Sequence, residues 1–541
     1  MNDWWRGAVI YQIYPRSFQD SDGDGIGDLP GITRRLDHVA ALGADAIWLS
    51  PFFASPMADM GYDVSDYTAV DPLFGRMADF DALVRRAHAL GLKVIIDQVL
   101  SHSSDRHPWF AESRADRDNP KADWYVWADP LANGAPPNDW LSVFGGPAWA
   151  WEPRRRQYYL HNFLAAQPDL NFHCPEVQDA LLDTMRFWLD RGVDGFRLDT
   201  VNFYFHDKKL RSNPPAPLRA GEDWPPGNPY DMQLHRYSKN QPENIAFLQR
   251  MRALLDGYDG RMLVGEVGDA HNAVALMADY TRGTDRLHMA YSFEMLGPQF
   301  TAAHFRDTVE GFYKAAPDGW PCWSFSNHDV IRHVTRWAEH GSSRTALARQ
   351  AAALLAGFQG TLCLYQGEEL GQTETELSYE ELTDPVGLTF WPDNKGRDGC
   401  RTPMVWEAEA PAAGFSTGTP WLPVKPAQQA HAVSTQGKGS VLEAYRDLLA
   451  FRRATPALVS GETTFLALPE PLLGFWRDGP EPVLCLYNLS PAPRALTLTG
   501  DARLIGPSQA SLSKTSLALP GNGFAFLAPP PGAARPGLTP A

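Results

Sequence analysis

Eight short segments rich in β-branched and aromatic residues recur along most of the chain, separated by stretches with apolar residues at helical spacing. Strand–helix units repeated in this way favour a closed parallel barrel over an open, doubly wound sheet. The sequence therefore predicts an α/β protein built on a (β/α)8 TIM barrel. The expected barrel strands are residues 8–13, 46–49, 94–96, 195–198, 262–265, 289–293, 322–325 and 362–365.

The spacing of these units is uneven, and the long gaps predict further domains. Residues 103–170 follow the third strand, are dense in Trp and Tyr, and are too long for a loop, so we expect a small inserted domain. The barrel then comprises residues 1–102 and 171–454, with a second insertion at 202–241. Short β segments separated by Pro/Gly turns predict an antiparallel β-sandwich over 455–528. Residues 529–541 are rich in Pro, Gly and Ala, and we expect them to be disordered.

The charge balance excludes two classes of partner. The chain has 64 acidic against 48 basic residues, a net charge of −16, which repels nucleic acid and anionic membrane surfaces. No stretch reaches the roughly 18 apolar residues of a membrane span. No secretory signal is visible, so we expect a cytoplasmic protein whose five cysteines are reduced thiols. The aromatic content of 12% suits a neutral, flat-faced ligand such as a sugar.

Four of the predicted barrel strands end in, or are followed by, a carboxylate: Asp97, Asp199, Glu266 and Asp329. A single acid at a strand end is commonly a helix cap or half of an ion pair. In a parallel barrel, however, the carboxyl ends of all strands meet at one mouth, where the active sites of such barrels lie. Clustered carboxylates cost free energy unless a function needs them, so we predict an active site there.

Converging carboxylates without a Cys/His pair or a phosphate-binding loop match the requirements of glycosidic bond cleavage, which uses one ionised and one protonated carboxyl group. Arg197 stands two residues before Asp199, so both side chains point to the same face of a strand. A cation there would keep Asp199 ionised, whereas Glu266 has no such neighbour in sequence. This asymmetry favours Asp199 as nucleophile and Glu266 as acid/base with a raised pKa.

These residues belong to a wider pattern that resembles glycoside hydrolase family 13, the α-amylase family, and within it the α-glucosidase and oligo-1,6-glucosidase branch. The resemblance covers nearly the whole chain, and its motifs appear in the family's order. They are residues 43–51 (GADAIWLSP), 97–102 (DQVLSH), 167–171 (QPDLN), 195–199 (GFRLD), 265–267 (GEV) and 327–329 (NHD). The match implies a barrel, a domain inserted after strand three, and a C-terminal β domain.

The resemblance also implies residue roles. Asp199 would form the glucosyl-enzyme ester, Glu266 would donate the proton, and Asp329 would hold the sugar hydroxyls in the transition state. The positions that match contacts to the innermost glucose are Asp59, Tyr62, His102, Arg197, His328 and Arg401. Asp59 with Arg401 would close the pocket behind the non-reducing end, which implies an exo-acting enzyme.

One motif departs from the family pattern. Many members have Asn before the motif's final His, where this chain has Ser101 before His102. In α-amylases that Asn helps to hold calcium between the barrel and the inserted domain, so we do not expect that calcium site here.

An acidic loop after the first strand predicts a different cation site. Residues 20–28 place acids at alternate positions among glycines, like the opening of an EF-hand loop, although position twelve is Gly31 rather than Glu. A solvated acidic turn is the alternative, and the glycine spacing does not fit a dinucleotide site. The resemblance implies a structural Ca²⁺ or Mg²⁺, and no organic cofactor. Its ligands would be Asp20, Asp22, Asp24, the carbonyl of Ile26, and Asp28.

Specificity is indicated by the residue after the predicted nucleophile. In this branch Thr at that position goes with α-1,4 and Val with α-1,6 linkages, so Thr200 implies maltose-type substrates, unless it only packs against the barrel wall. The 202–241 insertion should restrict the aglycone side, which predicts short α-glucosides and transfer to small alcohols. Phe163 and Phe144 are candidates for stacking on sugar faces, with plain packing as the alternative.

Three other functions remain open at this stage. A sucrose-active glucosyltransferase or isomerase, or an oligo-1,6-glucosidase, would use the same residues. A non-catalytic amylase-like partner of a membrane transporter is disfavoured, because all three carboxylates are present and no span is visible. A double displacement predicts retention of the α anomer, with the two carboxyl groups about 5–5.5 Å apart.

Overall fold

The computed structural model describes residues 3–217 and 227–540, and its centre is a parallel sheet of eight strands. The strand order is β11-β10-β9-β5-β2-β1-β13-β12, and a parallel bridge between Ala290 and Pro321 brings the two outer strands together. The predicted barrel is therefore confirmed, and each predicted strand overlaps an observed one. The strands are β1 (Val9–Ile13), β2 (Ala46–Leu49), β5 (Lys93–Gln98), β9 (Gly195–Leu198), β10 (Met262–Val267), β11 (Met289–Ser292), β12 (Cys322–Trp323) and β13 (Thr361–Tyr365).

Amphipathic helices surround the barrel, so the strands are buried on both faces and read as continuous apolar runs. The first helix shows how the sequence sets its ends. Asp28 caps it by accepting a hydrogen bond from the Gly31 N–H, and Gly43 ends it in the left-handed region with a φ of 99°. The main helices are α1 (Leu29–Leu42), α2 (Met77–Ala89), α4 (Pro175–Asp190), α5 (Asn244–Leu255), α6 (Ala273–Thr281), α7 (Ala302–Ala315), α9 (Arg344–Gly357) and α13 (Val441–Ala454).

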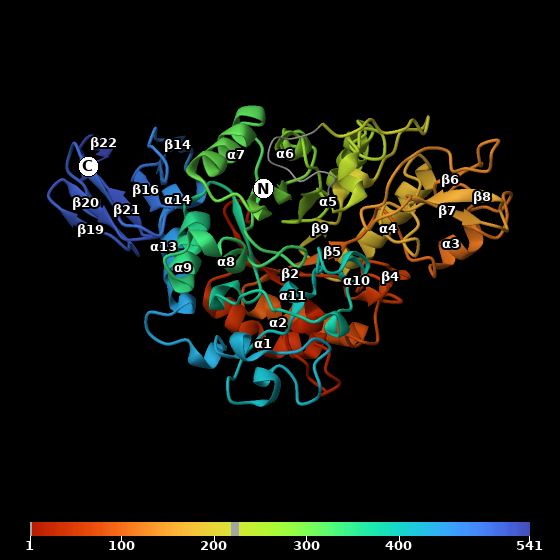
Figure 1. Cartoon of the computed structure of the whole chain (residues 1–541), viewed down its shortest axis with the longest axis horizontal. Helices are drawn as coiled ribbons and strands as arrows, with labels where there is room; N and C mark the ends of the chain where they lie inside the picture. The colour runs from red at the N-terminus through yellow and green to blue at the C-terminus, as the bar shows by residue number, and fades with distance from the viewer. Residues whose placement is uncertain (1–2, 218–226, 541) are drawn as a thin grey trace.

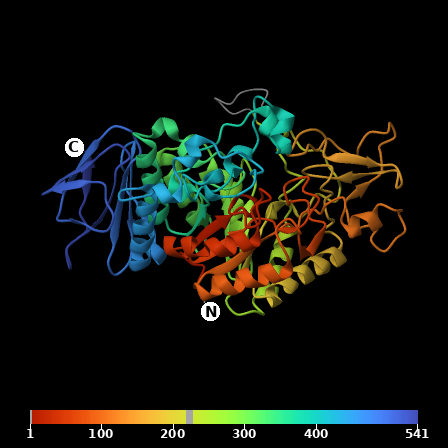
Figure 2. The same ribbon diagram turned by 90° about the horizontal axis from the view of Figure 1, so that it is seen from below.

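The inserted segment 103–170 lies at one end of the elongated molecule and the C-terminal sheets lie at the other, with the barrel between them (Figures 1 and 2). The insertion contains α3 (Pro108–Ser113) and an antiparallel sheet of β6 (Trp127–Ala128), β8 (Gln157–Leu160) and β7 (Trp149–Glu152). Before it, β3 (Phe53–Ala54) and β4 (Asp66–Val70) form a small hairpin next to the barrel.

The second insertion packs against the first. Asn228 Nδ2 donates to the Val143 carbonyl at 2.8 Å, and Trp140 Nε1 donates to the Arg211 carbonyl at 2.9 Å. The insertion contains the short helices η2 (Val201–Phe203) and η3 (Pro229–Met232), and its residues 218–226 lie outside the described part of the chain. Two segments that are distant in sequence thus share one wall at the barrel mouth.

The loops after β12 and β13 carry further short helices. They are α8 (His333–Arg336), α10 (Pro385–Phe390), α11 (Asp398–Arg401), α12 (Pro426–Gln429) and, before the C-terminal sheets, α14 (Pro456–Ser460). Among residues 3–217 and 227–540, the structure has no helix that is both long and apolar enough to cross a membrane.

The C-terminal region consists of two antiparallel sheets that share an apolar core. The first contains β14 (Thr463–Phe465), β15 (Leu472–Arg477), β16 (Val483–Asn488), β21 (Phe524–Ala528) and β18 (Arg503–Leu504). The second contains β19 (Ser511–Ser513), β20 (Ser516–Leu519), β17 (Arg494–Leu498) and β22 (Leu538–Pro540).

The expectation that residues 529–541 are disordered is wrong for β22. This strand pairs with β17, and Leu538 packs against the core shared by the two sheets. The Pro/Gly/Ala composition of the tail gave no sign that Leu538 lies in a strand at the edge of this sheet. Residue 541 lies outside the described residues.

Candidate active site

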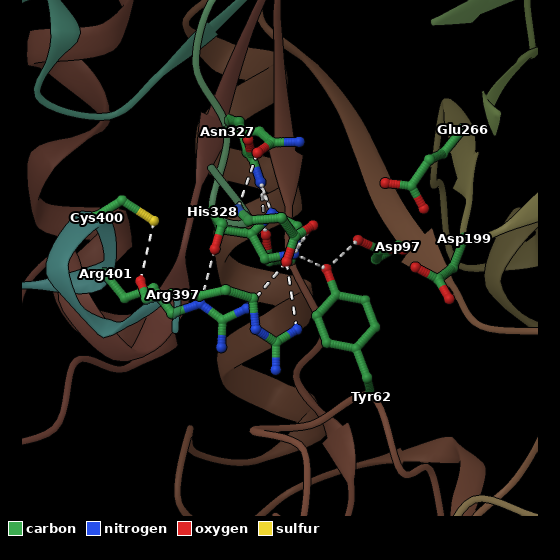
Figure 3. A network of polar contacts seen from close by, with 12 residues as sticks. Tyr62, Asp97, Asp199, Glu266, Asn327, His328, Arg397, Cys400 and Arg401 are labelled. Atoms are coloured by element: carbon green, nitrogen blue, oxygen red, sulfur yellow. Dashed lines mark hydrogen bonds and ion pairs between the residues drawn. The ribbon is translucent and has the colours of Figure 1, made fainter. Parts of the chain in front are cut away.

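Arg197 lies at the centre of the carboxylate cluster. Its side chain is fully buried, and its Nη1 contacts Asp97 Oδ1 at 2.7 Å and Asp199 Oδ1 at 2.8 Å. Its Nη2 contacts Glu266 Oε1 at 2.5 Å. As predicted, β9 places Arg197 and Asp199 on one face, and the strand-end acids of β5, β9 and β10 meet at the barrel mouth (Figure 3).

The sequence suggested that Asp199 alone has a neighbouring cation. In the structure, however, Arg197 forms an ion pair with Glu266 as well as with Asp199. The strands bring the guanidinium between the two carboxyl groups, a proximity that sequence spacing alone does not show. The two acids differ in the other hydrogen-bond donors that they contact. Asp199 Oδ2 accepts from the Thr200 hydroxyl at 3.2 Å. Glu266 accepts from the Tyr291 hydroxyl at 3.0 Å and from the Thr200 N–H at 3.0 Å.

Burial dominates the protonation of this cluster. It raises the pKa of Glu266 to about 7 and that of Asp199 to about 7, even though the charge of Arg197 opposes the change at both groups. Burial likewise raises the pKa of Asp97 to about 6. Ionising one of two neighbouring acids disfavours ionising the other, so the pair of Asp199 and Glu266 keeps a proton to a higher pH than an isolated carboxyl group would.

Asp329 belongs to a second, more positive group. Its Oδ1 contacts Arg401 Nη2 at 3.0 Å and Arg397 Nη1 at 3.4 Å. Burial acts to raise the pKa of Asp329, but the charges of Arg397 and Arg401 oppose burial, and this pKa lies well below its usual range. Asp329 is therefore ionised wherever the Asp199–Glu266 pair carries its proton.

The cation that pairs with Asp59 is Arg397, which corrects the prediction that Arg401 closes the pocket with Asp59. Arg397 Nη2 contacts Asp59 Oδ1 and Asp384 Oδ1, each at 2.7 Å. Arg401 is fully buried and instead donates through Nε to the His328 carbonyl at 2.7 Å. The two arginines stand four residues apart around the short helix α11, so both reach this side of the site (Figure 3). Both contact Asp329, and Arg397 also pairs with Asp59 and Asp384.

Tyr62 lies between the carboxylate cluster around Arg197 and the group around Asp329. Its hydroxyl lies 3.1 Å from Asp97 Oδ2 and 2.5 Å from His328 Nε2, and its ring stacks on that of His328 at a centroid distance of 5.3 Å. Burial lowers the pKa of His328 well below its usual value, so this imidazole is neutral. In Figure 3, Tyr62 lies between Asp199 and Glu266 on one side and the arginines on the other.

His102 is also neutral, because burial lowers its pKa to about 4. Its Nε2 contacts the Tyr62 carbonyl at 3.0 Å. Ser101, which stands where many family members have Asn, lies 2.9 Å from His102 Nδ1 and 2.9 Å from the Thr200 hydroxyl. Ser101 therefore links two predicted substrate residues.

These groups border a cavity of about 430 Å³. The predicted residues that line it are Asp59, Tyr62, His102, Phe144, Phe163, Asp199, Thr200, Glu266 and Asp329. Arg197, His328 and Arg401 lie behind this wall and hold its members by the contacts above. Lining residues that the sequence did not indicate include Arg397, Phe203, Tyr230, Lys239, Asp269 and Phe293. They come from loops and from short 3-10 helices, where no periodicity signals a role.

The acidic loop brings carboxylates together at a distance from this cavity. Asp20, Asp22 and Asp28 each offer an oxygen within 4.8 Å of the others, and no ion pair among the described residues involves them. Such a group of oxygen donors fits a hard cation. Asp24 is not in this group, and its carboxylate accepts from the Ile26 N–H at 2.8 Å.

Comparison with known proteins shows the family of this chain. The alpha-amylase catalytic domain family matches residues 12–461. A probable alpha-glucosidase of Rhizobium meliloti (strain 1021) is 59% identical over 494 residues, 90% of each chain. The oligo-1,6-glucosidase of Heyndrickxia coagulans is 37% identical over 530 residues, 91% of this chain and 93% of the relative.

Two solved structures are also similar to this chain over nearly its full length. The alpha-glucosyl transfer enzyme XgtA is 55% identical with a TM-score of 0.94, covering 98% of this chain and 100% of that one. The trehalulose synthase MutB from Pseudomonas mesoacidophila MX-45 is 32% identical with a TM-score of 0.86, covering 97% and 99%.

Proposed function

Because the chain belongs to the alpha-amylase family and is a glycoside hydrolase, we propose that it is a retaining, exo-acting α-glucosidase that acts on short α-glucosides. The observation that carries this proposal is the bridge from Arg197 to both Asp199 and Glu266 inside a small cavity. The bridge holds the two carboxyl groups next to each other, and burial raises the pKa of each to about 7. One of them can therefore stay protonated while the other is ionised, which is the requirement of a double displacement.

In the first step, Glu266 gives its proton to the glycosidic oxygen while Asp199 attacks the anomeric carbon, so the aglycone leaves and a glucosyl ester forms. In the second, Glu266 takes a proton from water, whose oxygen attacks the same carbon, and Asp199 is released as a carboxylate. Two inversions give α-glucose. An alcohol in place of water gives a new α-glucoside, and the resemblance to XgtA supports such transfer.

Exo action is supported by the Arg397 network. Asp59 and Arg397 both line the cavity and pair at 2.7 Å, and Arg397 also holds the buried Asp384. An ion pair of this kind ends the cavity with hydrogen-bonding groups that suit the hydroxyls of one terminal glucose. Asp329 beside it would bind hydroxyls as the transition state forms.

A maltose-type α-1,4 linkage is our preferred substrate, supported by Thr200 at the cavity wall. Sucrose is the second candidate, because the similar MutB structure has been solved with sucrose as its substrate. The relative named oligo-1,6-glucosidase makes isomaltose the third.

We further propose that the acidic loop binds Ca²⁺ or Mg²⁺ through Asp20, Asp22 and Asp28. The ion would neutralise carboxylates next to the start of α1 and so stabilise that turn. Because the loop is not among the residues that line the cavity, we assign the ion to stability rather than to chemistry.

The test is proton NMR of the protein with maltose, recorded from the first minutes before mutarotation mixes the anomers. We expect α-glucose to accumulate first. Azide then separates the roles of the acids: Asp199→Ala with azide and α-glucosyl fluoride should give the β-glucosyl azide, and Glu266→Ala the α-glucosyl azide. Early β-glucose, or the reverse pattern of azides, would contradict the assignment. If maltose is untouched, sucrose and isomaltose are tested next.

A further inference from the structure

Lys239 is a buried lysine in the wall of the active-site cavity that the proposed reaction does not use. Its side chain is nearly inaccessible, with the residue 4% exposed. Its Nζ donates to the Gly268 carbonyl at 2.7 Å and lies 4.0 Å from Asp269 Oδ2. The ammonium also lies 4.7 Å from the ring centroid of Phe203 and 5.4 Å from that of Tyr230.

Neighbouring contacts fix the position of this ammonium. Asn202 donates through Nδ2 to the same Gly268 carbonyl at 3.0 Å and accepts from the Gly268 N–H at 3.1 Å. Asn240 donates to Asp269 Oδ2 at 2.6 Å. Both ends of the 202–241 insertion are thereby attached to the loop after β10, so Lys239 is held in place before any ligand binds.

The place of Lys239 is on the leaving-group side. Gly268 stands two residues after Glu266, the group that protonates the glycosidic oxygen in the proposed reaction. Arg397, which pairs with Asp59, lies across Tyr62 from Glu266 (Figure 3), and in the proposed function this pair holds the terminal glucose. A sugar or alcohol beyond the scissile bond therefore lies against the wall that contains Lys239.

An ammonium has three N–H donors, and only one of them has a partner at hydrogen-bonding distance among the described residues. Burial lowers the pKa of Lys239 to about 8, against the opposing charges of Asp269 and Asp231. A buried donor that lacks a partner costs free energy until a ligand satisfies it.

We propose that Lys239 is the hydrogen-bond donor of the aglycone subsite, binding a hydroxyl oxygen of the leaving sugar and, in transfer, of the acceptor alcohol. This inference rests on the proposed function and adds the chemical class of the aglycone. That class is neutral and hydroxylated, because Asp231 and Asp269 line the same wall and would repel an anionic aglycone such as a sugar phosphate.

The test compares two donors in one variant. Lys239→Met keeps the unbranched stem but loses all three N–H groups. Maltose has an aglycone with hydroxyls, whereas the fluoride of α-glucosyl fluoride has none. We expect kcat/KM to fall by about tenfold more for maltose than for α-glucosyl fluoride. Transfer from glucosyl fluoride onto added glucose should fall relative to its hydrolysis, and Lys239→Arg should recover part of both losses.

Lys208→Met is the matched control, because Lys208 is exposed on the same insertion. It should leave both ratios at the parent values. Equal losses on the two donors, accompanied by a lower Tm, would show that Lys239 only braces the loop and would overturn the inference. If the parent protein cleaves neither donor, the proposed function itself fails.

Discussion

Arg397 and Asp59, which stand 338 residues apart in sequence, form a 2.7 Å ion pair at one end of the active-site cavity. Arg397 also contacts Asp384, whose side chain is fully buried, and approaches Asp329. One guanidinium thus contacts carboxylates from three parts of the chain. Arg397 thereby joins the loop after β13 to the segment after β2 at the cavity.

Arg397→Gln should therefore impair both stability and activity. Removing one partner of a buried ion pair leaves uncompensated charge, here on Asp59 and Asp384, at a cost of about 3–5 kcal/mol. We expect kcat/KM for maltose to fall by at least about a hundredfold, since the terminal glucose loses its charged contact. Urea unfolding and steady-state kinetics measure the two effects.

Lys395→Gln is the control for this change. Lys395 lies two residues away and forms an ion pair with the exposed Glu376, so we expect stability to change by no more than about 0.5 kcal/mol. An Arg397→Gln protein with the parent KM for maltose would show that the ion pair does not form the glucose-binding end of the cavity.

The shared proton of Asp199 and Glu266 predicts a bell-shaped dependence of kcat/KM on pH. The acidic limb reports addition of a second proton to the pair, and the alkaline limb reports loss of the last one. Both limbs depend on groups whose pKa burial raises to about 7, so activity should decline on the alkaline side once the acid is ionised.

Tyr291→Phe tests which group forms the alkaline limb. The Tyr291 hydroxyl donates to Glu266 Oε1 at 3.0 Å, which favours the ionised form. Losing a hydrogen bond worth about 1 kcal/mol should raise the pKa of Glu266 and move the alkaline limb up by about 0.7 pH unit. Tyr258→Phe, which removes a hydroxyl bound to Asp190 far from the barrel mouth, should not move it. A shift to lower pH would contradict the role of Glu266.

The barrel was predictable because its strands are covered on both faces. Residues 94–96 before Asp97 and 262–265 before Glu266 are apolar runs, and in β9 only Arg197 interrupts such a run. Strand β15, which lies between β14 and β16, is harder to recognise from sequence. It contains Gly474, where a side chain would meet Leu468 and Leu486, so a residue typical of turns is required inside this strand.

The strand-end acids were predictable for a related reason, because parallel strands bring their carboxyl ends to one mouth. The prediction gave Arg401 the contact with Asp59 that Arg397 makes in the structure. Two arginines four residues apart around a short helix cannot be told apart without the positions of their acids. Lys239 was missed because it lies on an insertion whose path no periodicity sets. The sequence thus indicated the site residues whose positions follow from the order of the barrel strands. The site residues that lie on loops could be identified only from the structure.

Removal of the proposed metal should lower stability without abolishing the fold. A cation held at 100 times its Kd contributes about 2.7 kcal/mol, so EDTA should lower Tm and added CaCl₂ should restore it. Asp22→Asn removes one exposed carboxylate of the group formed with Asp20 and Asp28 and should eliminate the response to calcium. Asp307→Asn, a change at an exposed acid on α7, should keep that response. A Tm that is the same in EDTA and in calcium would contradict the site.

The last prediction concerns Thr200, whose backbone N–H and side-chain hydroxyl donate hydrogen bonds to different acids. Its φ of 41° and ψ of 48° lie in the left-handed region, which is rare for a β-branched residue and marks strain retained at a functional site. This turn directs the Thr200 N–H to Glu266 and the hydroxyl to Asp199 and Ser101.

Thr200→Val keeps the shape and the strain of this residue and removes only the hydroxyl. If that hydroxyl also binds the aglycone of an α-1,4 linkage, the variant should lose activity on maltose more than on isomaltose, by about fivefold to tenfold. Competition between equimolar maltose and isomaltose, followed by NMR, measures this ratio directly. Thr200→Ser retains the hydroxyl and should keep the parent's ratio. An equal loss on both sugars in the Val variant would mean that the hydroxyl acts through Asp199 alone, because a contact to the nucleophile affects every linkage alike.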